Sequence, residues 1–333
     1  MIIDVHAHVI VPELLRDELL RGEPWRPRVW WQNGIQSVEL GGKTIRSAVR
    51  ELVDAESILA EQDAVGVDRV LVSPWAATLD AELPIAQAEC VAGVQNDGLA
   101  ALVAAHPDRI VALGALPLHD PAVAARELRE LMRRPGFAGV EIPARAGGRW
   151  LGDDGLRPLW VAAEETGALV FVHPTTHGLG IQALDDYYLW NTVGNPMETA
   201  IAAAHMTCAG VLENHPGLKV LLAHGGGVLL ALRGRLRHAW SFQPQVRSRM
   251  GASPDESLAC FLYDTVVHDV DLLRALVGCV GVDHVLLGSD YPFDMGDQHA
   301  AQLVRAVGLA RGDEERILGA TAASLLPKID RRA

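Results

Sequence analysis

The sequence predicts an α/β protein folded as a single (β/α)8 TIM barrel. Short apolar segments alternate with longer helical segments, and this pair recurs eight times along 333 residues. Strands that alternate with helices form a parallel sheet, and eight such units in a chain of this length favour a closed barrel. An open, doubly wound sheet is the alternative, but no GxGxxG motif follows an early strand, which disfavours it.

The expected strands are apolar runs rich in β-branched residues, and several are closed by a proline such as Pro74, Pro117 or Pro143. Proline cannot donate a hydrogen bond to a strand ladder, so it marks a strand end. The expected strands span residues 2–5, 69–73, 110–116, 137–142, 168–172, 219–223, 261–263 and 284–288.

The expected helices follow these strands and carry the usual end signals. Gly66 and Gly167 stand where two helices end, and Pro121 lies in the first turn of another. The expected helices span residues 49–65, 84–105, 121–133, 156–166, 196–214, 228–240 and 269–278, and further helical segments run to the C-terminus.

Two stretches do not fit this rhythm. The first, residues 11–48, contains Trp25, Trp30 and Trp31, and the second spans residues 175–195. Long insertions in a barrel are usually loops on the catalytic face, although a loop that merely caps the barrel is the alternative.

No low-complexity linker is present, so we expect one domain over residues 1–333 that includes the insertion 11–48.

Composition narrows the possible partners. The net charge is −13, from 29 Lys and Arg against 42 Asp and Glu. Binding to phosphate backbones needs a basic surface, so nucleic acid and an anionic membrane are not expected as partners.

No signal peptide or run of eighteen apolar residues is seen. The four cysteines are widely spaced and form no CxxC pair. We therefore expect a cytoplasmic protein.

Polar residues stand where several strands end. His6 and His8 follow the first strand, His173 the fifth, His224 the sixth and Asp290 the eighth. The carboxyl ends of barrel strands meet at one face, so these side chains are expected to converge. Residues at i and i+2 of a strand face the same side, which lets both early histidines reach one ion.

Imidazole and carboxylate ligands suit Zn²⁺, and Mn²⁺ is also possible. Any one of these histidines alone is more often structural than a ligand, and only the combination favours a metal site. His224 is either a fourth nitrogen ligand or a general base. Asp4 is expected on the same strand face as His6, one layer deeper, as a supporting residue and not a ligand.

The triglycine after His224 has several possible roles. Glycines before a helix can cradle a phosphate. No Lys-Ser/Thr pair follows Gly227, which excludes a P-loop. A close backbone approach or a tight turn beside His224 is the preferred interpretation.

Several longer motifs surround these residues. They are His6-x-His8, Val172-His173-Pro174, the segment VGNPMET at 193–199, AHGGG at 223–227, Gly234-Arg235-Leu236 and GSDYPF at 288–293. Together they resemble the amidohydrolase superfamily, and more closely its aminocarboxymuconate-semialdehyde decarboxylase branch. The similarity covers nearly the whole chain, and the HGGG and SDYPF elements are the most specific to the branch.

This resemblance implies one divalent metal ion held by His6, His8, His173 and Asp290, with water completing the shell. Zn²⁺ is preferred, with Mn²⁺ or Co²⁺ possible. It also implies His224 as the general acid/base, with Asp290 beside it in a catalytic role, and no organic cofactor. The implied activity is non-oxidative decarboxylation of an aromatic or unsaturated carboxylic acid.

Two alternatives stay open at this point. A hydrolase or hydratase of the same superfamily, acting on a lactone or an unsaturated diacid, would use the same metal ligands. A binding or regulatory protein that keeps the metal without turnover is the other.

A one-metal site is also favoured by the lysines. Many two-metal members of the superfamily use a carboxylated lysine at the end of strand four, but Lys43, Lys219 and Lys328 all lie elsewhere. Glu141 lies near that strand end. It could bridge two metals in principle, but a hydrogen bond or salt bridge is the preferred role.

The resemblance also implies substrate-binding residues. Arg46 matches an arginine that binds a substrate carboxylate, and Arg235 matches one that reaches the neighbouring subunit's site, which implies a homodimer. Phe293 is the third expected substrate-binding residue. Both arginines could instead be solvated surface charges.

The chain departs from the branch at two places. Thr175-Thr176-His177 replaces a Trp-Asp pair, and Gln243 replaces a basic residue. The substrate is therefore expected to differ from the branch's semialdehyde.

Overall fold

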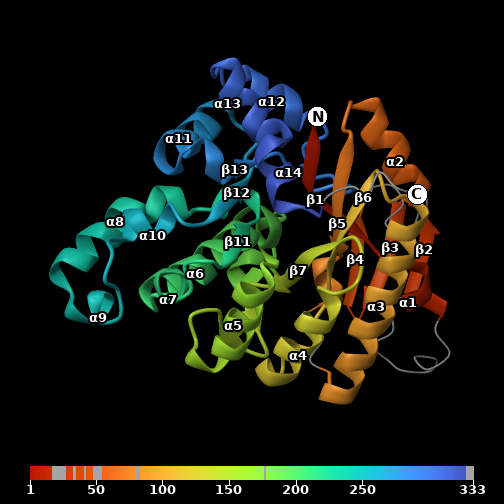
Figure 1. The fold of residues 1–333 in the computed structure, drawn as a ribbon, viewed down its shortest axis with the longest axis horizontal. Coiled ribbons are helices and arrows are strands. Elements are labelled where there is room, and N and C mark those ends of the chain that lie inside the picture. The colour runs from red at the N-terminus through yellow and green to blue at the C-terminus, as the bar shows by residue number, and fades with distance from the viewer. Residues whose placement is uncertain are drawn as a thin grey trace.

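The barrel is formed by eight parallel strands in sequence order. The computed structural model describes residues 1–16, 28–32, 35–40, 43–47, 55–79, 83–175 and 178–327 (Figure 1). The strands are β1 (Ile3–Val9), β5 (Arg69–Pro74), β6 (Ile110–Gly114), β7 (Phe137–Pro143), β10 (Leu169–His173), β11 (Lys219–Leu222), β12 (Leu262–Asp264) and β13 (Val285–Leu286).

Backbone hydrogen bonds close this sheet on itself. The Val5 amide donates to the Leu287 carbonyl at 2.9 Å, and the His8 amide donates to the Tyr291 carbonyl at 2.7 Å. The first strand is thereby joined to the last, and the predicted (β/α)8 barrel is confirmed.

Helices surround the barrel in the predicted alternation (Figure 1). They are α2 (Ala55–Ala64), α3 (Ile85–Ala105), α4 (Pro121–Leu131), α5 (Arg157–Thr166), α6 (Asn195–Cys208), α7 (Val211–Asn214), α8 (Leu229–Phe242), α9 (Pro244–Arg247), α10 (Pro254–Leu258), α11 (Val270–Val280), α12 (Ala300–Ala306), α13 (Arg311–Glu315) and α14 (Thr321–Leu325). Short 3-10 or π turns span Ala76–Thr78, Asp154–Leu156, Gly178–Gly180, Gln182–Leu184, Trp190–Gly194, His224–Gly226, Val282–His284 and Arg316–Ala320.

One predicted helix is wrong in its extent. Residues 196–214 were expected to form a single helix, but α6 ends at Cys208 and α7 begins at Val211. Gly210 between them adopts φ 66°, a left-handed conformation that ends a helix and that glycine adopts easily. The predicted start of the first helix, at residue 49, lies outside the described residues.

The insertion after the first strand is more regular than expected. It contains α1 (Pro12–Arg16) and an antiparallel sheet of β2 (Arg28–Gln32), β3 (Ile35–Leu40) and β4 (Lys43–Ser47), seen at the right of Figure 1. A second small hairpin joins β8 (Arg145–Ala146) to β9 (Arg149–Trp150). Trp30 and Trp31 in β2 are exposed.

Hydrophobic residues form two layers on either side of the strands. One cluster fills the barrel and includes Val5, Leu71, Leu113 and Phe171. The other includes Val72 and lies between the strands and the helices. Alternate residues of a strand join different layers, as expected for a pleated strand with both faces buried.

A β-bulge in β1 breaks this alternation. The pairing of β1 with β5 shifts register between Asp4 and Ala7. Val5 therefore belongs to the inner layer, and the His6 ring also faces inward, with its centroid 4.8 Å from that of Phe171. Asp4 lies on the outer face, where its Oδ2 accepts from Gln62 Nε2 of α2 at 2.9 Å. The expectation that Asp4 shares a face with His6 is wrong, because the bulge adds one residue between them.

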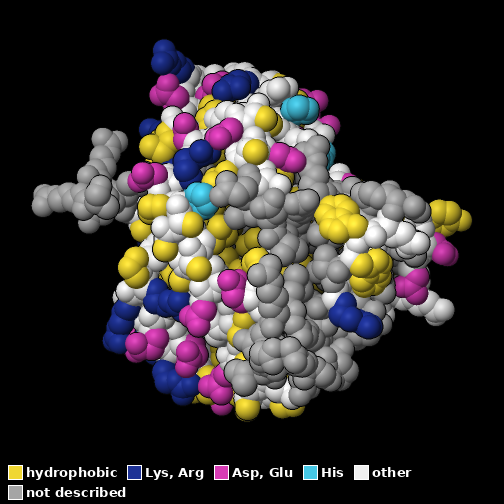
Figure 2. Space-filling view, turned by 90° about the vertical axis from the view of Figure 1, so that its right-hand side faces the viewer, with side chains coloured by type: hydrophobic (Ala, Val, Ile, Leu, Met, Phe, Trp, Pro, Cys, Tyr) yellow, Lys and Arg dark blue, Asp and Glu magenta, His cyan; other side chains and the backbone are white. Residues whose placement is uncertain are grey.

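The described surface carries charges of both signs. On the face shown in Figure 2, acidic and basic side chains are interspersed and form no large patch of one sign. Among the described residues, none of the helices has both the length and the apolar character needed to cross a membrane.

Candidate metal centre

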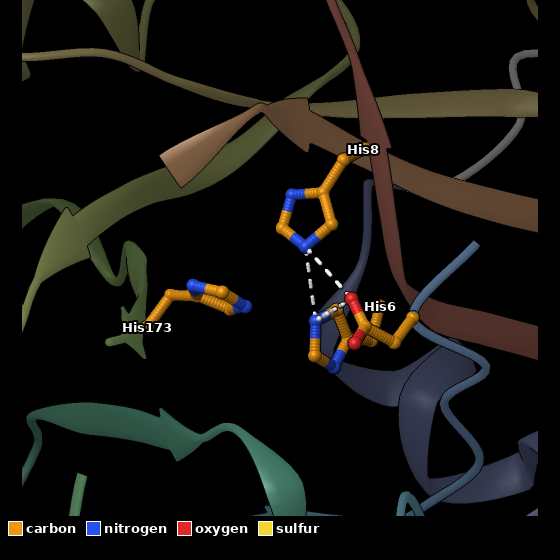
Figure 3. Close-up of side chains that lie close together, drawn as sticks. His6, His8 and His173 are labelled. Atoms are coloured by element: carbon orange, nitrogen blue, oxygen red, sulfur yellow. Dashed lines mark hydrogen bonds and ion pairs between the residues drawn. The ribbon is translucent and has the colours of Figure 1, made fainter. Parts of the chain in front are cut away.

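Four side chains from distant parts of the chain converge inside the mouth of the barrel. His6 and His8 come from β1, His173 ends β10, and Asp290 follows β13. Each offers one ligand atom, and these atoms lie within 4.8 Å of one another. All four residues are buried. In Figure 3 the rings of His6, His8 and His173 lie close together and point toward the space between them.

Each of the three histidines turns its Nε2 atom toward the cluster, and a hydrogen bond at its Nδ1 atom sets its tautomer. Nδ1 of His6 lies 2.6 Å from Oδ2 of Asp264, that of His8 lies 3.1 Å from the Pro74 carbonyl, and that of His173 lies 2.9 Å from the Pro174 carbonyl. Carboxylate and carbonyl oxygens only accept, so each Nδ1 carries a proton. Each Nε2 is then left with a lone pair directed into the cluster.

These lone pairs need a cation. The Nε2 atoms of His6 and His8 are 3.0 Å apart, and Oδ1 of Asp290 lies 3.2 Å and 3.3 Å from them. Nε2 of His173 has no hydrogen-bond partner within the described residues. Acceptor atoms at this spacing repel one another unless protons or a metal ion lie between them. Three imidazole nitrogens and one carboxylate oxygen therefore fit a divalent ion such as Zn²⁺ or Mn²⁺.

His6 and His8 bind protons tightly when no metal ion takes the place of those protons. Burial lowers the pKa of His6, but Asp290 and Asp264 outweigh it and raise the pKa to about 10. Burial likewise opposes protonation of His8, but Glu141 and Asp290 raise its pKa to about 9. The cluster therefore attracts positive charge.

His173 and Asp290 shift in the opposite direction. Burial, followed by the neighbouring histidine charges, lowers the pKa of His173 well below its ordinary value. Burial alone would raise the pKa of Asp290, but His6, His224 and His8 lower it well below its ordinary range. The site thus contains a neutral imidazole and an ionised carboxylate.

His224 lies at the edge of this cluster. Its Nε2 is 3.4 Å from Oδ2 of Asp290, and its ring centroid is 5.2 Å from that of His173. Its side chain is 15% exposed, against 8% for Asp290 and 0% for His6. His224 is thus more accessible to a substrate than these two residues.

His224 and Asp290 share an uncommon backbone conformation, with φ of 57° and 58°. Residues other than glycine rarely adopt this left-handed region, and residues held in such conformations cluster at active sites.

The sequence interpretation missed Asp264, at the end of β12. It is completely buried and accepts hydrogen bonds from His6 Nδ1 and from the backbone amides of His224, Gly225 and Val266. Burial opposes ionisation, but the hydrogen bond and charge of His6 outweigh it and lower the pKa of Asp264. An acidic residue directly after an apolar run, as at the other strand ends, was the available signal.

The family of the chain follows from comparison with known proteins. A model of the family described as amidohydrolase matches residues 3–328. The chain belongs to the amidohydrolase family. The resemblance noted in the sequence is thereby confirmed.

Relatives of this amidohydrolase include two named decarboxylases. The 2-amino-3-carboxymuconate-6-semialdehyde decarboxylase of Dictyostelium discoideum is 34% identical over 259 residues, which cover 77% of this chain and 70% of that protein. A gamma-resorcylate decarboxylase of Rhodococcus jostii is 27% identical over 99% of both chains.

A solved structure shares the fold of this amidohydrolase. It is a dihydroxybenzoic acid decarboxylase of Polaromonas with bound manganese and the inhibitor 2-nitroresorcinol. It aligns with a TM-score of 0.79 at 22% identity and covers 97% of this chain and 96% of that chain.

The expected substrate-binding residues of the amidohydrolase lie in three different settings. The ring centroid of Phe293 is 5.4 Å from that of His8 and 6.2 Å from that of Trp75, a buried residue that the sequence interpretation also missed. Arg46 lies in β4 opposite Ser37, but its side chain is outside the described part of the structure. Arg235 is exposed on α8, and no hydrogen bond or ion pair joins it to another described residue.

Glu141 does not belong to the group of four converging residues, but it contacts one of them, His8. It is completely buried, and its Oε2 lies 3.5 Å from His8 Nδ1. Neither of its oxygens has a hydrogen-bond partner within the described residues. The close contact with His8 is the weak ion pair that the sequence interpretation preferred.

The loop after His173 is held by Glu198. The Thr175 amide and hydroxyl donate to this buried carboxylate at 2.9 Å and 2.8 Å. The next two residues, Thr176 and His177, lie outside the described residues.

Proposed function

We propose that this protein is a metal-dependent, non-oxidative decarboxylase of an aromatic or unsaturated carboxylic acid. The observation that carries the proposal is the convergence of three Nε2 lone pairs and one Asp290 oxygen beside the accessible His224. The named relatives support decarboxylation over hydrolysis, since both are decarboxylases. Hydrolysis or hydration remains the second candidate, because it would use the same site.

The proposed metal ligands are His6, His8, His173 and Asp290. The donor set suits one Zn²⁺ ion best, and Mn²⁺ and Co²⁺ also accept such ligands. A bound divalent ion supplies positive charge that polarises the substrate and makes water more acidic.

His224 is the proposed general acid/base. Its position beside Asp290 lets Nε2 pass a proton to the substrate carbon that carries the carboxylate. The bond to the carboxylate carbon then breaks, its electron pair restores the unsaturated system, and CO₂ leaves. Asp290 orients His224 through the 3.4 Å contact with Nε2.

Phe293 and Trp75 form the proposed apolar wall of the substrate site. The Phe293 ring is close to both the His8 ring and the Trp75 ring. A planar substrate ring would pack against the rings of Phe293 and Trp75. Arg46 is the proposed partner of the substrate carboxylate, because arginine binds carboxylates through paired hydrogen bonds.

A homodimer is proposed to complete the site. Helix α8 buries only Leu229 of its own residues and projects at the left of Figure 1. Leu232 and Phe242 on this helix are 43% and 67% exposed. A second copy covering this helix would bury them and place Arg235 at the neighbouring site.

The cytoplasm is the proposed compartment. All four cysteines, Cys90, Cys208, Cys260 and Cys279, are free thiols, which agrees with a reducing environment.

The decisive experiment measures products. Metal-loaded protein is incubated with hydroxybenzoates, unsaturated dicarboxylic acids and lactones, and CO₂ release is followed. We expect CO₂ from at least one acid. Ring opening or water addition without CO₂ from any acid would contradict the proposal.

The His224→Ala variant tests the assigned acid/base. We expect turnover to fall by about 10²-fold to 10⁴-fold, since this is the usual contribution of a proton-transferring group. Metal content should stay unchanged, and loss of the metal would identify His224 as a ligand instead. His299→Ala, an exposed histidine that does not contact the cluster, is the matched control.

A further inference from the structure

We infer that Asp264 is a positioning residue that couples the metal site to the acid/base, by holding the His6 imidazole and the His224 backbone on one carboxylate. The roles of His6 and His224 rest on the proposed function, whereas the contacts of Asp264 do not.

The contacts of Asp264 are divided between two parts of the site. Oδ2 accepts from His6 Nδ1 at 2.6 Å and from the His224 amide at 2.9 Å. Oδ1 accepts from the Gly225 amide at 2.7 Å and from the Val266 amide at 3.1 Å. One rigid group thus fixes both the ring of a metal ligand and the turn that carries the acid/base.

These contacts require a carboxylate and no other side chain. All four partners are donors, so both oxygens of residue 264 must accept. Asparagine has one acceptor oxygen, and its amino group would point at donors. A buried donor left unpaired costs about 1–3 kcal/mol, so the isosteric amide is a strong perturbation here.

The glycine-rich turn is built around this carboxylate. His224 and Gly225 follow one another in the left-handed region, with φ of 57° and 59°. Successive amides in such a turn point to the same side and form an anion-binding concavity. The start of the triglycine segment, which could have cradled a phosphate, therefore binds the protein's own Asp264 through the His224 and Gly225 amides.

Asp4 provides a natural comparison for Asp264. It too is completely buried, and it accepts from the His6 amide at 3.0 Å and from the Ser289 amide at 3.0 Å. It touches neither the His6 imidazole nor the His224 turn in the described structure. Asp4→Asn therefore removes a buried carboxylate from the strand that carries His6 without removing the proposed coupling.

The experiment measures the affinity of each protein for Zn²⁺ without substrate, by competition with a chromophoric chelator. We expect Asp264→Asn to weaken metal binding about 10-fold to 100-fold, the usual effect of removing the carboxylate that supports a histidine ligand. Asp4→Asn should weaken it much less. Unchanged affinity in Asp264→Asn, or an equal loss in Asp4→Asn, would overturn the inference.

Turnover at saturating Zn²⁺ is the second readout. Because Asp264 also anchors His224, kcat of Asp264→Asn should stay low when all sites are filled, with little change in KM. Full recovery of kcat would show that His224 does not depend on this carboxylate. The metal affinities are independent of the reaction, so they separate this inference from the proposed decarboxylase activity.

Gly225→Ala perturbs the turn that carries His224 and leaves the Asp264 carboxylate unchanged. It therefore tests the coupling even if Asp264→Asn fails to fold. A Cβ at Gly225 would lie 2.4 Å from Val267 Cγ1, so the turn must move, although none of the four proposed metal ligands is substituted. If Asp264 couples the two parts, Zn²⁺ binding weakens several-fold in this variant. Wild-type affinity would overturn the coupling.

Discussion

His6 and His8 bind protons far more tightly than His173, although all three face the same point. Their raised pKa values come from Asp290, Asp264 and Glu141, whereas His173 mainly experiences burial and the charges of the other histidines. In the metal-free protein, protons on His6 and His8 therefore supply the positive charge that a metal ion would otherwise provide.

This difference predicts how stability depends on pH. The pKa values of His6 and His8 rise from 6.5 to about 10 and about 9 on folding, so their protonation stabilises the metal-free fold. That contribution is complete below pH 6.5 and is lost as the pH rises through 9 to 10. We expect the melting temperature of metal-free protein to fall across this range.

The metal-loaded protein is the control for this prediction. A bound ion replaces the protons, so its melting temperature should change less between pH 6.5 and 10. Differential scanning calorimetry with and without chelator provides both curves. Parallel curves would contradict the assignment of the raised pKa values to the metal site.

At the scale of elements, the segment after β13 must pass very close to β1 and β12. A Cβ at Gly288 would lie 2.9 Å from His6 Cβ and 3.0 Å from Asp264 Cβ. Only glycine allows this approach, which explains the first residue of the GSDYPF motif.

Gly288→Ala should therefore disturb the metal site without removing a ligand. We expect a loss of about 1–3 kcal/mol in the free energy of unfolding, typical of overpacking, together with weaker metal binding. Urea unfolding and chelator competition measure the two effects. Gly278→Ala in α11 is the matched control, since no atom lies within 4 Å of its added Cβ, and it should be neutral or slightly stabilising.

The strands and most helices were predictable because their signals are local. Apolar runs, prolines and glycines determine where an element begins and ends, and histidines at strand ends are visible without a structure. The convergence of His6, His173 and Asp290 followed from the barrel topology alone, because that topology brings strand ends together.

What the sequence did not reveal depends on three-dimensional detail. The bulge that moves Asp4 to the outer face is a register shift with no marker in the residues. Asp264 follows an apolar run as the other strand-end residues do, but β12 is only three residues long, so the signal was weak. Gly210 divides α6 from α7 because it adopts a left-handed conformation, whereas Gly234 lies within α8.

For the whole molecule, the proposed homodimer makes a prediction about mixed subunits. His224→Ala and Arg235→Ala proteins are each expected to be nearly inactive. If Arg235 acts across the interface, a mixed dimer has one site with both residues intact. Random exchange of subunits should then restore about a quarter of wild-type activity, since half of the dimers are mixed and each has one working site.

Activity after unfolding and refolding the mixture checks this prediction. Each variant refolded alone is the control, and light scattering reports the oligomeric state. No recovery in a mixture that contains mixed dimers would mean that Arg235 acts within its own subunit, and an active Arg235→Ala control would mean that it has no catalytic role.

The ligands of the proposed metal site are spread over nearly the whole chain, from His6 to Asp290. During synthesis on a ribosome, a nascent chain that has already released His6, His8 and His173 still lacks the carboxylate and the last strand. The full ligand set therefore forms only after Asp290 has left the ribosome. The metals available at that stage, and not those present when His6 emerged, decide which ion the site acquires.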